Sequence, residues 1–301
     1  MLTITLTIVL WLPAFFMDLE IEFSHLVSTN IKWLDIVIAI FLIAAQSIYL
    51  NIIVGEYKLV KDNSHLTSLM FVLFNSCCLL LLNLNQVVIA NTFVLIAFHQ
   101  LLRMYNLKNN YAILFNASFL IALASLIYLP YIAYFFLLWL TLIYTATPKW
   151  RDFTISLIGL SIPLIYFITY KFVVNDLSEI NFNNELITIF NVRWSEFTFF
   201  LKLFFIVFTV ITLLSFMSLV STLNRSGVRV KKMLVVVVGW MSVFGLTTLF
   251  MNQFDYLATF LIVSIPLAIV IANFFQNIKK TWLAEILFLC LLGGSILSYF
   301  S

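Results

Sequence analysis

Long apolar runs with no charged residue are the feature that most constrains what this chain can fold into. Runs such as 79–82, four leucines, and 235–238, four valines, are apolar on every side, whereas a strand of a membrane barrel alternates apolar and polar residues. The chain is 63% hydrophobic and 10% charged, with a mean hydropathy of +1.11, while soluble domains carry about 25% charged residues. The sequence therefore predicts an all-α membrane protein.

Eleven stretches are apolar enough to cross a bilayer core, which is about 30 Å thick and needs roughly 20 residues of helix. They cover residues 2–17, 34–54, 66–84, 87–102, 111–128, 130–147, 153–173, 196–221, 233–251, 256–275 and 283–300. The first stretch lacks a basic leading segment and a small-residue cleavage site, so we expect an uncleaved helix. Only Asn85 and Gln86 divide the third stretch from the fourth, so 66–102 could instead form one long bent helix or a re-entrant pair.

The polar loops are too short to form a soluble domain. The two longest loops on one side of the predicted bundle are 18–33 and 174–195, and about twenty residues suffice for a surface helix or a lid, not for a domain. We therefore predict a single integral membrane domain over residues 1–301, with 174–195 as an ordered cap.

Basic residues are unevenly divided between the two sides of this bundle. If the N-terminus is cytoplasmic and all eleven stretches cross, twelve of the sixteen Lys and Arg are cytoplasmic. These are Lys58, Lys61, Arg103, Lys108, Lys149, Arg151, Arg225, Arg229, Lys231, Lys232, Lys279 and Lys280. Loops rich in Lys and Arg stay in the cytoplasm, so we predict a multi-pass inner-membrane protein with its N-terminus inside and its C-terminus outside. The net charge of +3 is too small to indicate a nucleic-acid partner.

Three carboxylates follow the first apolar stretch at alternate positions, in the first outer loop: Asp18, Glu20 and Glu22. If the segment is extended, all three carboxylates point to the same face; if it is helical, Asp18 and Glu22 share a face. Together they could bind a divalent cation, or one of them could act as a general base. An acidic outer loop is also common in membrane proteins that have no such site.

Other site signatures are missing from the sequence. His25, His65 and His99 form no zinc or di-iron pattern, and the catalytic serine, phosphate-loop and dinucleotide motifs are absent. Cys77, Cys78 and Cys290 lie in apolar runs and are expected to face lipid or the core. Five asparagines in or beside the stretches could connect helices or line a pore: Asn51, Asn75, Asn83, Asn91 and Asn116.

One four-residue motif occurs in two of the apolar stretches. Ser161-Ile162-Pro163-Leu164 in the seventh matches Ser264-Ile265-Pro266-Leu267 in the tenth. Proline-interrupted helices in corresponding positions build the substrate site of many transporters. Two ordinary proline kinks, satisfied by neighbouring helices, explain the same pattern.

The region from 57 to 151 carries a resemblance to a known family. Its segments are Tyr57-Lys58-Leu59, Asn63-Ser64, Arg103-Met104-Tyr105, the run from Phe115 through Asn116-Ala117-Ser118-Phe119 to Pro130, and Pro148-Lys149-Trp150-Arg151. These segments resemble an uncharacterised family of polytopic inner-membrane proteins from Bacteroidota, and the similarity extends loosely over most of the chain. More distantly, the chain is similar to the membrane glycosyltransferases of the C-type fold, which take sugars from polyprenyl phosphates.

The resemblance implies a site at the outer face. Asp18, Glu20 or Glu22 would be the acid that activates the acceptor, and Lys32, Arg193 or Lys202 would receive the donor phosphate. We expect no cofactor, and the only candidate metal is the divalent cation that the three acids could bind. The chain departs from those enzymes in its first outer loop, 18–33, which has only sixteen residues. It also has few outer cations.

Three functions therefore stay open. The first is a glycosyltransferase-like enzyme that acts on polyprenyl-linked sugars, with membrane lipid as its partner. The second is a non-catalytic subunit of an envelope assembly or secretion complex, with a membrane protein as its partner. The third is a transporter, which requires a polar cavity near Pro163 and Pro266.

Overall fold

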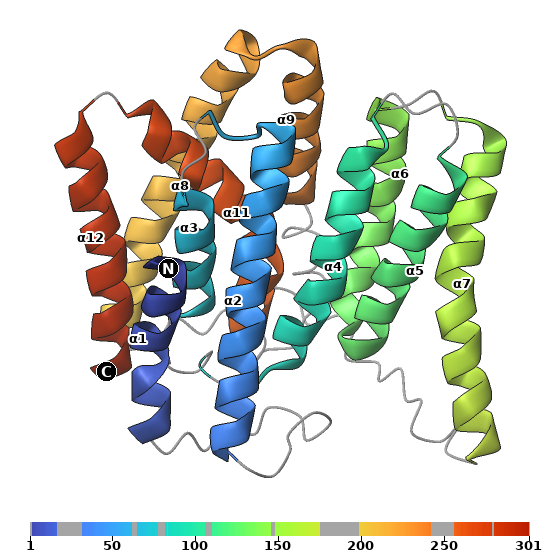
Figure 1. Ribbon diagram of the computed structural model, residues 1–301, viewed down its shortest axis with the longest axis horizontal. Helices are drawn as coiled ribbons and strands as arrows, with labels where there is room; N and C mark the ends of the chain where they lie inside the picture. The colour runs from blue at the N-terminus through green and yellow to red at the C-terminus, as the bar shows by residue number, and fades with distance from the viewer. Residues whose placement is uncertain are drawn as a thin grey trace. The chain divides into compact units, whose positions relative to one another are not determined.

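The computed structural model describes residues 2–16, 32–61, 65–77, 82, 84–105, 110–145, 148–174, 199–241, 256–278 and 280–300. Every element in these ranges is helical (Figure 1). The α-helices are α1 (Leu2–Phe16), α2 (Lys32–Tyr57), α3 (Leu66–Asn75), α4 (Gln86–Arg103), α5 (Tyr111–Ile127), α6 (Ala133–Thr145), α7 (Trp150–Val173), α8 (Phe199–Arg225), α9 (Val228–Met241), α11 (Tyr256–Asn277) and α12 (Thr281–Leu297). Two short 3₁₀ helices are η2 (Leu129–Ile132) and η6 (Ser298–Phe300). The predicted helical class is confirmed, and a helix lies in each of the eleven predicted stretches.

Five of the helices are long and apolar enough to cross a membrane. The qualifying segments are Trp33–Tyr57, Gln86–Arg103, Trp150–Val173, Lys202–Arg225 and Phe260–Asn277. At a rise of about 1.5 Å per residue, the 24 residues of α7 reach about 36 Å, which exceeds the hydrocarbon core. These helices fit a membrane protein, while the count of eleven spans and the orientation stay predictions.

The chain divides into two compact units. The first contains Met1–Val88, Val192–Val237 and Val263–Ser301, and the second contains Ile89–Asn191 and Val238–Ile262. In the first unit α2 packs on α1 and α3, and α8 packs on α12; in the second, α5 packs on α7. The prediction of a single membrane domain stays a prediction.

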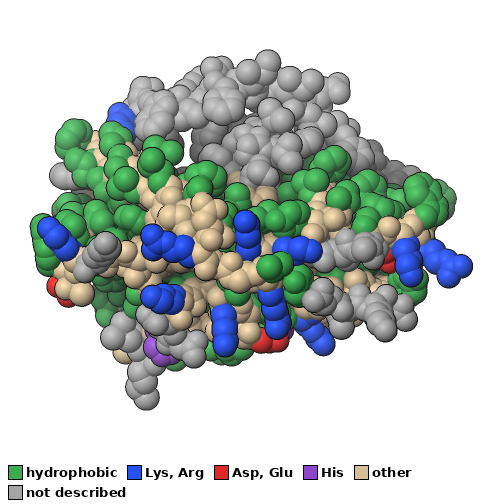
Figure 2. Space-filling model, turned by 90° about the horizontal axis from the view of Figure 1, so that it is seen from above, with side chains coloured by type: hydrophobic (Ala, Val, Ile, Leu, Met, Phe, Trp, Pro, Cys, Tyr) green, Lys and Arg blue, Asp and Glu red, His purple; other side chains and the backbone are tan. Residues whose placement is uncertain are grey.

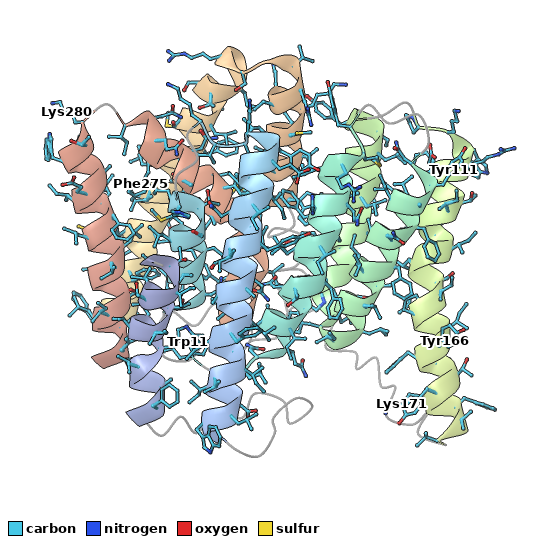
Figure 3. All side chains as sticks on the ribbon, viewed as in Figure 1. Trp11, Tyr111, Tyr166, Lys171, Phe275 and Lys280 are labelled. Atoms are coloured by element: carbon cyan, nitrogen blue, oxygen red, sulfur yellow. The ribbon has the colours of Figure 1, made fainter. Side chains whose placement is uncertain are left out.

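Apolar side chains are exposed along the helices at the surface of each unit. In the second unit, Ile165 is 59% exposed, Tyr166 74% and Phe172 65%, all on the latter half of α7. Figure 3 labels Tyr166 on this half of α7. In the first unit α8 exposes Leu213 (63%) and Met217 (72%). Continuous apolar surface of this kind is unfavourable in water and suits hydrocarbon.

Within each unit, lysine and arginine gather at the helix ends that are seen from above in Figure 2. We call this the basic end. In the first unit it carries Lys58, Lys61, Arg225, Arg229, Lys231, Lys232 and Lys280, and in the second Arg103, Lys149 and Arg151. Lys108 and Lys279, the other two basic residues predicted for cytoplasmic loops, lie outside the described ranges. Lys171 lies at the opposite end of α7 (Figure 3).

The stretch 66–102 forms two separate helices, not one bent helix. α3 ends at Asn75 after 10 residues, and α4 begins at Gln86. Asn85 marks the start of α4, because its side-chain oxygen accepts a hydrogen bond from the Val87 amide (3.2 Å). A carboxamide that binds a free amide in the first turn is a typical helix start. α4 thus begins at the predicted division, whereas α3 ends at Asn75 and not at 84. Two spans and a re-entrant pair stay as alternative predictions for 66–102.

A glycine sets the close packing of α5 on α7 in the second unit. Ser118 of α5 lies against Gly159 of α7, and a Cβ atom built on Gly159 would lie 2.1 Å from Ser118 Oγ and 2.7 Å from the Phe115 carbonyl oxygen. The Ser118 hydroxyl donates to the Leu114 carbonyl at 2.9 Å. Small residues let two membrane helices approach until their backbones nearly touch.

We predict that Gly159→Ala separates α5 from α7 and destabilises the protein by about 1–3 kcal/mol, the usual cost of overpacking. The matched control is Gly293→Ala in α12, where a Cβ meets nothing within 4 Å. Thermal unfolding of the purified protein in detergent measures both changes. Equal stability of the two variants would contradict the close packing.

Candidate functional site

The residues predicted to carry chemistry fall partly outside the described ranges. The residues outside the described ranges are Asp18, Glu20, Glu22 and Arg193, together with most of the predicted cap 174–195. Lys32 is the first residue of α2. Lys202 is the fourth residue of α8 and is half-buried.

The helix ends next to these residues lie together at the end of the first unit opposite the basic end. α1 ends at Phe16, two positions before Asp18 in the chain, and α2 begins at Lys32 (Figure 1). α8 begins at Phe199, and its Phe204 packs against Gly294 near the C-terminus of α12. The antiparallel pairing of α8 with α12 therefore places Lys202 near the C-terminal end of the chain. Lys202 and the ends of α1 and α2 thus occupy the same end of this unit.

A first buried polar cluster surrounds the end of α3 in the first unit. The Trp11 indole N–H of α1 donates to Ser76 Oγ at 2.9 Å. The Tyr299 hydroxyl donates to the Ser76 carbonyl, and the Ser298 hydroxyl donates to the Cys77 carbonyl at 2.8 Å. All five residues are less than 9% exposed. We call this group the α3-end cluster.

The α3-end cluster supplies hydrogen-bond donors where the short helix α3 ends. Ten residues of α3 reach about 15 Å, half of a hydrocarbon core. A helix that ends inside an apolar interior leaves its last carbonyl groups without helical donors, and each unpaired group there costs several kcal/mol. Side chains from α1 and from the C-terminal η6 reach this end and donate to Ser76 and Cys77.

A second buried polar cluster lies in the second unit. The Tyr131 hydroxyl donates to Asn91 Oδ1 at 2.6 Å, and Asn91 Nδ2 donates to the Leu261 carbonyl at 3.1 Å. The Tyr134 hydroxyl donates to the Ile262 carbonyl at 2.8 Å. We call these three side chains the α11-break cluster.

Proline explains why α11 needs these donors. Pro266 lies inside α11 and has no amide hydrogen, so the carbonyl four residues earlier, that of Ile262, loses its helical partner. Tyr134 supplies the missing donor. The Tyr134 ring in turn lies against the buried Trp240, with ring centroids 4.7 Å apart, and Trp240 lies against Phe98 at 4.8 Å. Aromatic packing thus holds the Tyr134 ring in the position from which its hydroxyl donates to α11.

Both clusters consist of neutral side chains, most of which donate to backbone carbonyl groups, while Trp11 and Tyr131 donate to side-chain oxygens. Neutral side chains of this kind can orient a ligand, but these donors already bond to acceptors within the protein. Within the described residues, no three His, Cys, Asp or Glu side chains lie close enough together to hold a metal ion. Cys77 is buried and Cys290 is exposed, in line with their expected places facing core and lipid. The described geometry therefore assigns the clusters a structural role, and acid–base chemistry needs the predicted acids.

Sequence reasoning found some of these residues and missed others. Asn91 was among the asparagines expected to connect helices, and it does, whereas Asn75 bonds to the Phe71 carbonyl of its own helix (2.8 Å). Tyr131, Tyr134 and Tyr299 were not anticipated. A tyrosine in an apolar run carries no sign of its partner, and Tyr299 lies 223 residues from Ser76 in the chain. For Tyr134 a signal did exist, because a proline in a buried helix implies a donor elsewhere.

No protein-family model, curated protein or solved structure matches this chain.

We predict that Tyr134→Phe destabilises the protein by about 1–3 kcal/mol, because the Ile262 carbonyl is then buried without its donor. Tyr144→Phe is the matched control, since Tyr144 is on the same helix but 42% exposed. Denaturant or thermal unfolding in detergent compares the two. A Tyr134→Phe protein as stable as the control would show that the hydroxyl does not support α11.

Proposed function

We propose that this chain is a multi-pass inner-membrane protein, N-terminus inside and C-terminus outside, that transfers a sugar from a polyprenyl phosphate at the outer face. One observation carries the proposal. The ends of α1 and α2 that flank Asp18, Glu20 and Glu22 in sequence lie at the same end of the first unit as Lys202, away from the basic end. Acids and a cation for the donor phosphate would then act at one face.

The charge distribution supports the orientation. In each unit the described Lys and Arg of the predicted cytoplasmic loops lie at the basic end, and loops rich in these residues stay inside. The opposite end of the first unit would then face outward, where lipid-linked sugars are used by the enzymes that this chain resembles.

The proposed reaction needs a base and a cation. One carboxylate among Asp18, Glu20 and Glu22 takes the proton of an acceptor hydroxyl as its oxygen bonds to the anomeric carbon. The bond from that carbon to the phosphate oxygen breaks, and the electron pair leaves with the polyprenyl phosphate. Lys32, Arg193 and Lys202 are the cations that would pair with this phosphate.

The described geometry does not favour the transporter. A transporter would leave the broken backbone of its helices open to a substrate. Here the Tyr134 hydroxyl donates to the Ile262 carbonyl, which has lost its helical donor because of Pro266. The Tyr299 and Ser298 hydroxyls donate to the two carbonyl groups that follow α3, those of Ser76 and Cys77.

The orientation predicts which positions react with a membrane-impermeant thiol reagent in intact cells. In a chain with its three native cysteines replaced by serine, single cysteines at Asn106 and Ser226 should be protected. Cysteines at Ser178 and Asn183 should be labelled. The opposite labelling pattern would contradict the orientation.

If the chain is this enzyme, substituting the acid that acts as the base should abolish its activity. The test is whether each single variant restores the glycan profile of a deletion strain: Asp18→Asn, Glu20→Gln and Glu22→Gln. The variant that removes the general base should lower the rate of sugar transfer by about 10²–10⁴. Glu179→Gln, in the other predicted outer loop, is the control and should restore the profile, with all variants expressed at equal levels. If the triple variant restores it fully, the chain is not this enzyme, and a non-catalytic membrane subunit becomes the better account.

A further inference from the structure

The densest run of positive charge in the chain lies where α8 turns into α9, in the first unit. Residues 225–232 read Arg-Ser-Gly-Val-Arg-Val-Lys-Lys, with four cations in eight positions and no carboxylate. Arg225 ends α8, and the other three cations lie in the first two turns of α9. Arg225, Arg229 and Lys231 are all exposed.

The structure holds this turn in a fixed place. The Ser226 hydroxyl donates to the Thr222 carbonyl at 2.7 Å, and Asn277 Nδ2 of α11 donates to Thr222 Oγ1 at 3.0 Å. On the other side of the turn, Met233 and Leu234 of α9 are buried. The cations are therefore carried by two anchored helix ends.

The surface between the cations has the character of a membrane interface. Val228 is 72% exposed beside Arg229, and Gly227 has open space where a Cβ would be, with nothing within 4 Å. The first amides of α9 add the positive end of its helix dipole at the same place. An apolar side chain next to cations matches a lipid, whose acyl chains adjoin a charged head group.

We infer that the turn from Arg225 to Lys232 binds the head groups of anionic phospholipids in the adjacent leaflet. Clusters of four or more Lys and Arg directly beside a membrane helix attract anionic lipid, and each contributes to binding near the surface. The other cations of the basic end in this unit lack this density: Lys58 and Lys61 follow α2, near the exposed Glu56, and Lys280 precedes α12, which carries the exposed Glu285. This inference is independent of the proposed enzyme activity.

Native mass spectrometry of the full-length protein in detergent tests the inference, with phosphatidylglycerol and phosphatidylcholine of identical acyl chains as the probes. The wild type should bind phosphatidylglycerol more tightly than phosphatidylcholine. The variant Arg225→Gln/Arg229→Gln/Lys231→Gln should lose at least about tenfold in affinity for phosphatidylglycerol. Its binding of phosphatidylcholine and its unfolding temperature should not change, which shows that it is folded.

The matched control is Lys58→Gln/Lys61→Gln/Lys280→Gln, which removes three exposed charges from the same end of the same unit. It should lose less than about twofold, because a specific surface depends on where the charges lie. An equal loss in the two variants would overturn the inference in favour of diffuse attraction. A wild type without preference for phosphatidylglycerol would also overturn it, and would leave the turn as a contact for an acidic protein. Displacement of the lipid by millimolar glycerol phosphate would identify a site for a soluble phosphate instead.

Discussion

A peptide carbonyl that faces hydrocarbon has no water to bond to, and two breaks in the described helices, at the end of α3 and at Pro266 of α11, are organised around that constraint. α3 stops after 10 residues, and α11 contains a proline in a segment that is 83% buried. In each case the carbonyl groups that lose helical donors are met by hydroxyl groups from distant parts of the chain. The donors come from inside the protein, so the breaks need neither water nor a ligand.

This constraint separates the interior from the ends of the helices. The buried clusters are neutral, because an ionised group at membrane depth is costly and would need a partner of its own. Charge is concentrated where the helices meet water, with cations at one end of each unit. Chemistry that needs a base and a cation is therefore expected at the loops, and the three predicted acids lie in one of these loops.

The positions of the helices could be predicted from the sequence because each apolar run is a strong local signal. The start of α4 at Gln86 was also readable, since Asn85 is a local helix-start residue. The early end of α3 was not, because it depends on Trp11 and Tyr299, which lie 65 and 223 residues from Ser76. Hydrogen bonds between distant residues leave no mark in a single sequence.

The candidate site shows the same limit. Asp18, Glu20 and Glu22 stand out locally as three acids beside an apolar run, but what they face depends on how distant segments meet. The structure describes where α1 ends, where α2 begins, and where Lys202 lies in α8. The roles of the three acids stay predictions.

Hydrogen–deuterium exchange of the full chain in lipid nanodiscs tests most directly whether the helix breaks are closed to water. Amides of residues 71–77 and 262–268 should remain unexchanged for hours, because their surroundings are buried and bonded within the protein. The amides near Arg225 and Lys280, at exposed helix ends, should exchange far faster under the same conditions. Exchange within minutes at either break would reveal a path for water through the bundle and would contradict a closed, neutral interior.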